Sequence, residues 1–181
     1  MMLYAGIAAG ISTGIATAGW FLLRRRKAKV WLDEMDLSTM EQGWDKPKAK
    51  RSIGDKPLTV NGKVYQRGVG THVHSRYAIN LKGNCRKFEA QFGMDDEEDQ
   101  GGAFFRVYVD KKLVFEKELN AKTGNRGPCH VEVDLTGAHR MDLVVADRGD
   151  GIIYDHVDWL DASFLLIDQR GPKPEPIQFA E

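Results

Sequence analysis

The sequence predicts an all-β protein, a two-sheet β-sandwich of the jelly-roll type, preceded by an N-terminal transmembrane helix. Three observations support this prediction. Apolar and polar residues alternate in several short segments, glycine-rich turns separate those segments, and an uncharged apolar stretch opens the chain. Alternation with a period of two is typical of strands that bury one face. At 181 residues the chain is long enough for one hydrophobic core, so we expect a single domain with attached segments.

The predicted transmembrane helix runs from Leu3 to Leu23, a stretch without a charged residue. As an α-helix these residues would measure about 31 Å, which matches the hydrocarbon core of about 30 Å. Gly6, Gly10 and Gly14 would share one helix face, which predicts self-association through close helix packing. A cleaved signal peptide is the alternative, because the tripeptide at residues 16–18, Ala-Thr-Ala, is typical of a cleavage site.

A basic flank, Arg24 to Lys29, follows the apolar stretch and completes a predicted membrane anchor over residues 1–29. The positive-inside rule would keep this flank, and the domain after it, in the cytoplasm. Since five of the 26 basic residues lie in the flank, acidic residues outnumber basic ones in the rest of the chain. A mildly acidic domain does not suit binding to a phosphate backbone, so no nucleic-acid partner is expected.

Strands are expected where the alternation is clearest. Asn61 and Gly62 separate two short apolar runs as a hairpin turn of the primed type, and Asp110 to Lys112 separate two longer ones. Ser38 and Glu41 have the spacing of a capping box for one short helical turn. The expected strands cover Tyr77 to Leu81, Phe88 to Phe92, Phe105 to Val109, Val131 to Leu135, Met141 to Ala146 and Ala162 to Ile167.

The last segment, residues 169–181, contains three prolines in a short polar stretch, which is typical of a linker or a disordered end. The sandwich is therefore expected over residues 30–168. Cys85 and Cys129 are too few for a disulfide framework or a four-ligand zinc site, and the sequence leaves open whether they pair.

Three stretches carry a resemblance to a known family, in this order: "SIGDKPLTVNGKVYQRGVGTHVHS", "GMDDE" and "ADRGDGIIYDHVDWLDA". They are similar to successive signature stretches of the NPCBM family, a galactose-binding-like β-sandwich module that is often attached to glycoside hydrolases. The resemblance runs from about Val30 to Ile167. It implies a jelly roll that binds galactose-type or related glycans without cleaving them.

The expected function is therefore non-catalytic carbohydrate binding by a membrane-tethered module, which would assist a glycoside hydrolase. Because glycans lie mostly outside the cytoplasm, this function favours export of the domain over the cytoplasmic placement that the basic flank predicts. A membrane-anchored scaffold for a protein partner is the first alternative. A hydrolase is the second, but no nucleophile, metal or cofactor motif accompanies the available acids.

The stretch "YDHVDW", residues 154–159, joins the groups that suit a sugar: carboxylates and an imidazole for hydroxyls, and aromatic rings for the apolar face of the sugar ring. In an extended strand, alternate residues face opposite sides, so Val157 and Trp159 are expected in the core and Tyr154 and His156 toward the ligand. The residues expected to contact the glycan are His72, Asp96, Arg106, Tyr154, Asp155 and His156.

The acidic loop that begins at Asp95 supplies hard oxygen ligands between two strands, which suits a structural calcium ion. The alternative is a solvated charged loop that needs no ion. The candidate calcium ligands are Asp95, Asp96 and Glu97. No cofactor is required for glycan binding.

A zinc site is a further alternative. His72 and His74 are two residues apart, so on a strand they would share a face, and His156 or Asp158 would complete a set of zinc ligand types. Hydrogen-bonded histidines of the core or rim are commoner, so we favour the structural interpretation.

Overall fold

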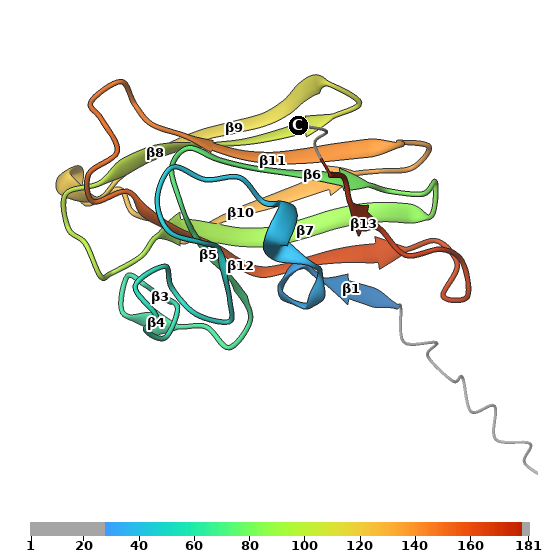
Figure 1. Ribbon diagram of the computed structural model, residues 1–181, viewed down its shortest axis with the longest axis horizontal. Helices are drawn as coiled ribbons and strands as arrows, with labels where there is room; N and C mark the ends of the chain where they lie inside the picture. Colours follow the sequence, from blue (N-terminus) through green and yellow to red (C-terminus); the bar gives the residue numbers. More distant parts are fainter. Residues whose placement is uncertain (1–27, 179–181) are drawn as a thin grey trace, which may run out of the picture.

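The computed structural model describes residues 28–178, which form a β-sandwich of two layers (Figure 1). These residues form strands, turns and three short 3₁₀ helices, η1, η2 and η3, and no α-helix lies among them. None of their helices is long and apolar enough to cross a membrane. The predicted span from Leu3 to Leu23, with its glycine face, lies outside the described residues. The 3₁₀ helices cover Leu32–Glu34, Leu37–Thr39 and Ala121–Thr123.

The first sheet has β12 at its centre. Its strand order is β10-β7-β12-β5-β2, and β1 pairs with the second half of β12. All of its strand pairs are antiparallel. The strands are β1 (Lys29–Trp31), β2 (Lys48–Ala49), β5 (Gly68–His72), β7 (Cys85–Met94), β10 (Cys129–Asp134) and β12 (His156–Leu166).

The second sheet has the order β13-β6-β11-β8-β9, also with antiparallel pairs throughout. From β5 to β12 the chain crosses to the other sheet at every step except the β8–β9 hairpin, so both inner faces share one core. A separate hairpin is formed by β3 and β4. The strands are β3 (Thr59–Val60), β4 (Lys63–Val64), β6 (Ser75–Asn80), β8 (Gly102–Val109), β9 (Lys112–Asn120), β11 (Arg140–Ala146) and β13 (Glu175–Pro176).

The predicted all-β sandwich is confirmed, and each expected strand falls within or overlaps an observed one. The hairpin at Asn61 and Gly62 forms with φ angles of 51° and 76°, as a primed turn requires. Asp110 and Lys111 also have positive φ and join β8 to β9. Alternation with turn residues therefore located most of the longer strands, but not β5, whose five residues are all buried and do not alternate.

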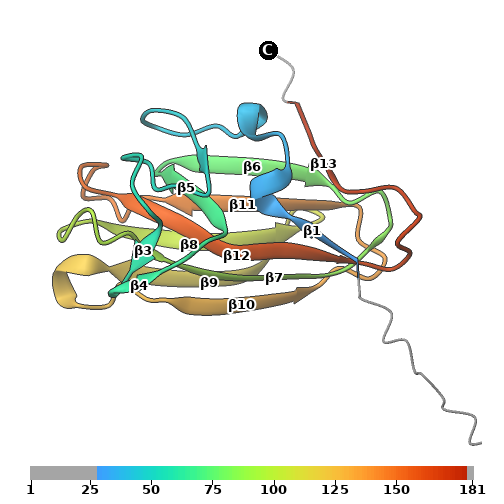
Figure 2. The same cartoon turned by 90° about the horizontal axis from the view of Figure 1, so that it is seen from below.

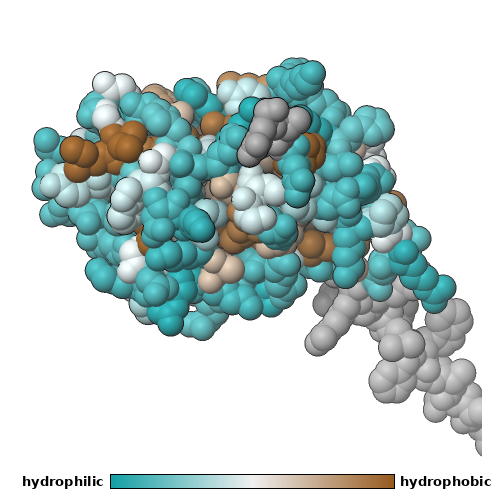
Figure 3. Space-filling model, viewed as in Figure 1, coloured by the Kyte–Doolittle hydropathy of each residue, from teal (hydrophilic) through white to brown (hydrophobic). Residues whose placement is uncertain are grey.

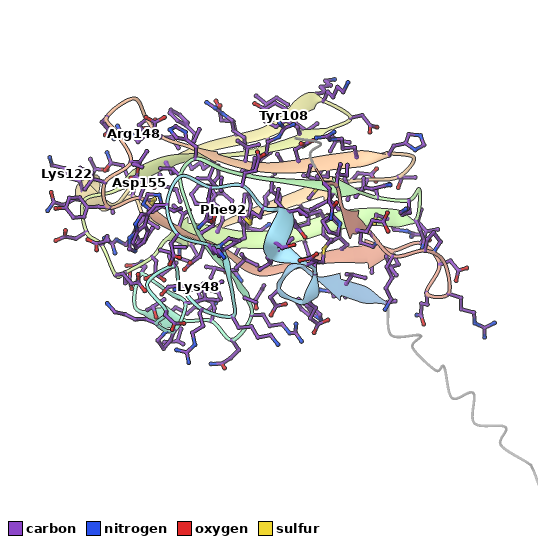
Figure 4. All side chains as sticks on the ribbon, viewed as in Figure 1. Lys48, Phe92, Tyr108, Lys122, Arg148 and Asp155 are labelled. Atoms are coloured by element: carbon purple, nitrogen blue, oxygen red, sulfur yellow. The ribbon has the colours of Figure 1, made fainter. Side chains whose placement is uncertain are left out.

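The core between the sheets is aromatic. Trp159 on β12 is completely buried, as the sequence predicts, and its ring centroid lies 5.7 Å from that of Phe92 and 5.3 Å from that of Phe105. Phe92 comes from the first sheet and Phe105 from the second, and Figure 4 shows Phe92 between the layers. The indole thus joins the two sheets through apolar contacts.

The β3–β4 hairpin covers part of the outer face of the first sheet. It packs closely because Gly93 stands beneath it, where a Cβ would lie 2.5 Å from a methyl of Val60. The segment that leads to the hairpin is equally close to the sheet: a Cβ on Gly70 would lie 2.3 Å from the Arg51 carbonyl oxygen. Under the hairpin, a second small apolar cluster contains Leu58, Val60, Tyr65 and Leu160.

One prediction about the end of an element is wrong, and the open question of the two cysteines is answered. Ser38 and Glu41 form no capping box: the N-cap of η2 is Asp36, whose side chain accepts a hydrogen bond from the Ser38 amide at 2.9 Å. Asp36 directly precedes the helix, so its carboxylate reaches the free backbone amides of the first turn and takes the N-cap role that was expected of Ser38. Cys85 and Cys129 are both free.

The proline-rich tail is an ordered part of the sandwich as far as residue 178, in contrast to the predicted linker or disordered end. β13 pairs with β6, and the Ile177 amide donates to the Ala78 carbonyl at 2.8 Å. Upstream, the side-chain amide of Asn84 donates to the carbonyls of Asp168 and Pro172. Backbone pairing with an open sheet edge therefore fixes this segment despite its composition.

Candidate functional site

His72 and His156 face each other across neighbouring strands. His72 ends β5 and His156 begins β12, and the two residues are direct partners in the antiparallel register. Their ring centroids lie 5.6 Å apart. The stretches "GTHVHS" and "YDHVDW" therefore meet at one place, although 78 residues, 76–153, separate them.

Trp44 completes a cluster of three rings with these histidines. Its indole stacks on His156 with a centroid distance of 5.6 Å and an interplanar angle of 17°, and it meets the edge of His72 at 5.5 Å. The side chain comes from the loop between η2 and β2 and is 50% exposed. We name Trp44, His72 and His156 the ring cluster.

The loop that carries Trp44 is held in two ways. Gly43 lies against the connection between β5 and β6, where a Cβ on Gly43 would come within 2.5 Å of the Val73 carbonyl oxygen. Gln42 accepts a hydrogen bond from the Thr71 hydroxyl at 2.6 Å and donates to the carbonyl of Trp44 at 2.8 Å. The indole is therefore positioned by its own loop before any ligand arrives.

A pocket of about 370 Å³ lies at the ring cluster. Its other walls come from the loops after β7 and β11, and two of these residues are strongly exposed, Ile153 at 73% and Tyr154 at 44%. The space-filling view shows an apolar patch at this end of an otherwise largely hydrophilic face (Figure 3). The pocket is lined by Trp44, His72, Glu98, Ile152, Ile153, Tyr154 and His156.

Glu97 holds His156 from behind. Its carboxylate accepts a hydrogen bond from Nδ1 of His156 at 2.8 Å and further ones from the Ser52 hydroxyl and the Gly54 amide. Burial works against ionisation of Glu97, but the hydrogen bonds from Ser52 and His156 outweigh it and lower the pKa of this carboxyl below its usual value. Glu97 is therefore an ionised support of the ring cluster.

Asp155 is placed differently from the sequence prediction. It is buried, and its Oδ1 accepts a hydrogen bond from the Gly102 amide at 2.7 Å, so it attaches the β11–β12 loop to β8. Burial raises the pKa of Asp155 to about 6, against the bond from Gly102, and Asp150 and Asp147 add to the rise. Figure 4 shows Asp155 and Arg148 together at the loop end of the sandwich.

Asp96 also has a structural position. Its carboxylate accepts hydrogen bonds from the amides of Asn61 and Gly62, at 2.9 and 2.7 Å, and pairs with Arg126 at 2.8 Å. It thereby caps the turn of the β3–β4 hairpin, outside the pocket. This is the usual role of a carboxylate beside a tight turn whose amides point outward.

Arg106 lies on the outer face of the second sheet, away from the ring cluster. It alternates with Phe105, which faces the core, and pairs with Glu116 on β9 at 2.6 Å. Tyr108 lies two residues further along the same face (Figure 4). Of the six residues expected to contact a glycan, the structure brings together three, His72, Tyr154 and His156.

The carboxylates of the acidic loop point to different partners. Asp95 accepts from the Thr59 and Glu97 amides, and Asp96 and Glu97 are engaged as described above. Among residues 28–178, no group of three or more histidine, cysteine, aspartate or glutamate side chains is arranged to hold a metal ion. Calcium binding at this loop stays a prediction, which a calcium titration monitored by thermal unfolding would test.

The other residues considered for metal or acid-base chemistry are also separated. β5 ends before His74, whose side chain is exposed and lies 3.6 Å from an oxygen of Asp147. Asp158 is completely buried under the hairpin, where burial and the neighbouring Asp95 raise its pKa well above the usual range. A carboxyl in that position is not accessible to a ligand.

The sequence interpretation missed Trp44, Glu98, Ile152 and Ile153. A signal for Trp44 existed: it is a large aromatic residue among turn formers in "QGWDKP", outside every alternating segment. Isolated surface aromatics need no special explanation by themselves, and only the contact with two imidazoles distinguishes this one.

Two curated relatives are much longer proteins. The alpha-1,3-galactosidase B of Akkermansia muciniphila is 29% identical over 117 residues, which cover 63% of this chain. A Renibacterium salmoninarum protein named as an endo-alpha-N-acetylgalactosaminidase is 29% identical over 136 residues, 71% of this chain. The chain spans 15% and 9% of their respective lengths, so the similarity concerns one part of each.

Solved structures give similarity over whole modules. The CBM51 of Clostridium perfringens GH95, in complex with methyl-galactose, is 30% identical at a TM-score of 0.68, and the match covers 76% of this chain and 99% of that one. CBM51-2 of Clostridium perfringens ZmpB, solved with GlcNAc and INT domains, has the same TM-score at 24% identity, over 78% of this chain and 32% of that one. The second likeness supports the fold alone.

The family model of the NPCBM/NEW2 domain matches residues 28–165, most of the chain and nearly all of the described sandwich. This match confirms the resemblance seen in the three signature stretches. The chain belongs to the NPCBM/NEW2 domain family.

Proposed function

We propose that this chain is a non-catalytic carbohydrate-binding module that holds a galactose-type sugar in the pocket at the ring cluster. The observation that carries the proposal is the half-exposed indole of Trp44 beside two imidazoles. A sugar ring offers an apolar C–H face to an aromatic ring and hydroxyls to nitrogen and oxygen atoms. The pocket supplies both kinds of surface within one small volume.

The choice of a galactose-type sugar is supported by the CBM51 of Clostridium perfringens GH95. That module matches this chain over 99% of its own length and was solved with methyl-galactose. We therefore take methyl-galactoside as the first ligand to test.

The positions of the buried acids support binding without cleavage. Glycoside hydrolysis needs two carboxyl groups at the scissile bond, one as acid and one as base or nucleophile. Asp155 and Asp158 are buried, and Glu97 is bonded to Ser52, Gly54 and His156, so Glu98 is the one carboxylate among the described residues that line the pocket. We expect no turnover of nitrophenyl galactosides above background.

Isothermal titration of methyl-galactoside into the protein tests the proposal. Saturable binding to wild type that is lost in His156→Ala, with an unchanged melting temperature, would support it. Absence of binding to galactosides and to a glycan array would contradict it and favour the protein scaffold. A control variant is Leu113→Ala, which removes an exposed side chain from β9, on the second sheet and outside the pocket.

We also propose that residues 1–29 anchor the module in a membrane with the domain outside the cytoplasm. The arrangement of the described residues suits such an anchor. β1 begins at one end of the sandwich and the β3–β4 hairpin and β11–β12 loop lie at the other (Figures 1 and 2). The pocket would then face away from the anchored end.

Two measurements test the anchor. The full chain should resist carbonate extraction from membranes, and a chain that begins at Val30 should be soluble. Protease added to intact cells should cleave an exported domain. Protection until lysis would place the domain in the cytoplasm, as the basic flank predicts.

A further inference from the structure

Both histidines of the ring cluster have their Nδ1 atoms bound inside the protein by groups that accept hydrogen bonds and have no proton to give. Nδ1 of His72 lies 2.6 Å from the carbonyl oxygen of Val73, and Nδ1 of His156 lies 2.8 Å from Oε2 of Glu97. A carbonyl and an ionised carboxylate only accept. Each hydrogen bond therefore requires a proton on Nδ1, which leaves Nε2 of a neutral ring as an acceptor.

The ionised state of Glu97 is built into its surroundings. Its side chain is only 5% exposed, and the Ser52 hydroxyl donates to Oε1 while the Gly54 amide donates to Oε2 at 3.2 Å. A Cβ on Gly54 would lie 2.3 Å from Oε2, so only glycine lets the chain wrap the carboxylate this closely. Each of these partners is a donor, and together they favour the carboxylate over the acid.

His72 is held as a neutral ring. Burial lowers its pKa below the usual value, against the hydrogen bond to Val73, and the neighbouring His156 acts in the same direction as burial. Among the described residues, no hydrogen bond from protein to Nε2 of either histidine occupies that atom. Both rings line the pocket, His72 with only 4% of its surface exposed, and neither Nε2 is among the fully buried side-chain atoms without a partner in residues 28–178. A ligand in the pocket can therefore approach these nitrogens through the edges of the two rings.

We infer that the pocket selects a sugar that donates two hydroxyl protons, one to Nε2 of His72 and one to Nε2 of His156, and that Glu97 is a positioning residue which sets the second acceptor. This inference rests on the proposed function and deepens it. A substituent that can only accept a hydrogen bond, such as fluorine, cannot donate to either Nε2 and therefore cannot substitute for either hydroxyl. Glu97 acts on the ligand only through the imidazole of His156.

The first test needs no ligand. Two-dimensional ¹H–¹⁵N spectra of the imidazole nitrogens report which nitrogen carries the proton. The spectra are recorded at about pH 9, well above the ordinary imidazole pKa of about 6.5, so that neutral rings are observed. In wild type, His72 and His156 should both be protonated at Nδ1 and unprotonated at Nε2. Glu97→Ala should shift His156 toward the Nε2-protonated form and leave His72 unchanged as an internal control. A wild-type His156 protonated at Nε2 would overturn the inference.

Glu97→Gln is the conservative rescue. Its amide oxygen can accept from His156 and Gly54, and its amide nitrogen can donate to Ser52. We expect the wild-type tautomer and near wild-type binding of methyl-galactoside in this variant, and binding weakened by about threefold to tenfold in Glu97→Ala. Equal loss in both variants, with the tautomer unchanged, would show a merely structural role and overturn the inference.

The second test uses methyl-galactosides in which each hydroxyl in turn is replaced by fluorine. Two of these compounds should bind wild type about threefold to tenfold more weakly than the parent, because fluorine has no proton to donate. In Glu97→Ala, the loss of affinity caused by one of these two fluorine substitutions should be smaller than in wild type, because His156 no longer presents a fixed acceptor to that hydroxyl. If the parent binds and all fluorinated compounds bind equally well, the inference fails while the proposed function stands. If the parent itself does not bind, the proposed function fails, and the tautomer result is unaffected.

Discussion

Two tryptophans of this protein have opposite environments. Trp159 is completely buried between the sheets, where it contacts Phe92 and Phe105. Trp44 is 50% exposed and contacts two imidazoles at the edge of a pocket. The same side chain therefore stabilises the fold at one position and, by our proposal, binds the ligand at the other.

The difference comes from the elements that carry the two residues. Trp159 belongs to the central strand of the first sheet, whose inner side chains must fill the core. Trp44 belongs to an irregular loop, and its indole is placed by Gly43 and Gln42 instead of by strand pairing. An aromatic ring on a preformed loop loses little freedom when a ligand binds to it.

The largest effect is expected when the core tryptophan is truncated. Trp159→Ala should lower the free energy of unfolding by about 3–5 kcal/mol, because it leaves a cavity at the contact between the sheets. Chemical denaturation measures this loss. Loss of less than about 1 kcal/mol would mean that Trp159 is not part of the core contact, and the comparison with Trp44 would fail.

A smaller effect on stability is expected at Asp155, which lies between the core and the pocket loops. Its pKa in the folded protein is about 6, above the ordinary value of 3.8. Between these values the folded protein keeps a proton that the unfolded chain has lost, so the free energy of unfolding falls as pH rises from about 4 to about 6.

Asp155→Asn should remove that part of the pH dependence. Its stability relative to wild type should rise by about 1–3 kcal/mol between pH 4 and pH 7, because each unit of pKa shift corresponds to about 1.4 kcal/mol. Thermal or chemical unfolding at several pH values gives the difference. Parallel curves for the two proteins would show that Asp155 has no raised pKa. Asp95 and Asp158 titrate in both proteins and cancel in this comparison.

Trp44→Ala should affect binding without affecting folding. Removal of the exposed indole should weaken methyl-galactoside binding by about tenfold, which corresponds to about 1.4 kcal/mol, and change the free energy of unfolding by less than about 0.5 kcal/mol. Titration calorimetry and denaturation on the same sample give both numbers. A variant that unfolds as readily as Trp159→Ala would assign Trp44 to the fold.

The smallest effect is expected at Arg106. Because it pairs with Glu116 on the outer face of the second sheet, Arg106→Ala should change galactoside affinity by less than about twofold. The same titration checks this. A clear loss of affinity would move the ligand to the other sheet and favour the original expectation from the sequence.

Much of the fold was predictable because alternation and turn residues act locally. The segment around Phe88 to Phe92, the hairpin turn at Asn61 and the burial of Trp159 all follow from period-two patterns and the conformational needs of tight turns. The resemblance in the signature stretches was also confirmed, because the family model matches residues 28–165, which include these stretches.

The site was only partly predictable because it depends on register and on loops. His72 and His156 come together through the pairing of β5 with β12. The sequence indicated both stretches as parts of one ligand site, but not the register that makes the two histidines direct partners. For Arg106, alternation predicted an exposed face without indicating on which sheet that face lies. Asp155 was misplaced because β12 begins only at His156.

The same limit applies to Trp44 and to the tail. The position of Trp44 follows from close backbone packing at Gly43, which no periodic pattern reports. The tail up to residue 178 is ordered by an open edge of β6, a partner that its own composition does not reveal. In both cases a non-local contact overrides the local sequence preference.

The most direct test of the central claim follows the tryptophan indole signals in ¹H–¹⁵N spectra during titration with methyl-galactoside. The chain has four tryptophans, so assignment by single substitutions is practical. Our account predicts a saturable shift of the Trp44 indole signal and none for the buried Trp159. Saturable binding that leaves the Trp44 signal unchanged would contradict it, and so would the absence of any shift at saturating ligand.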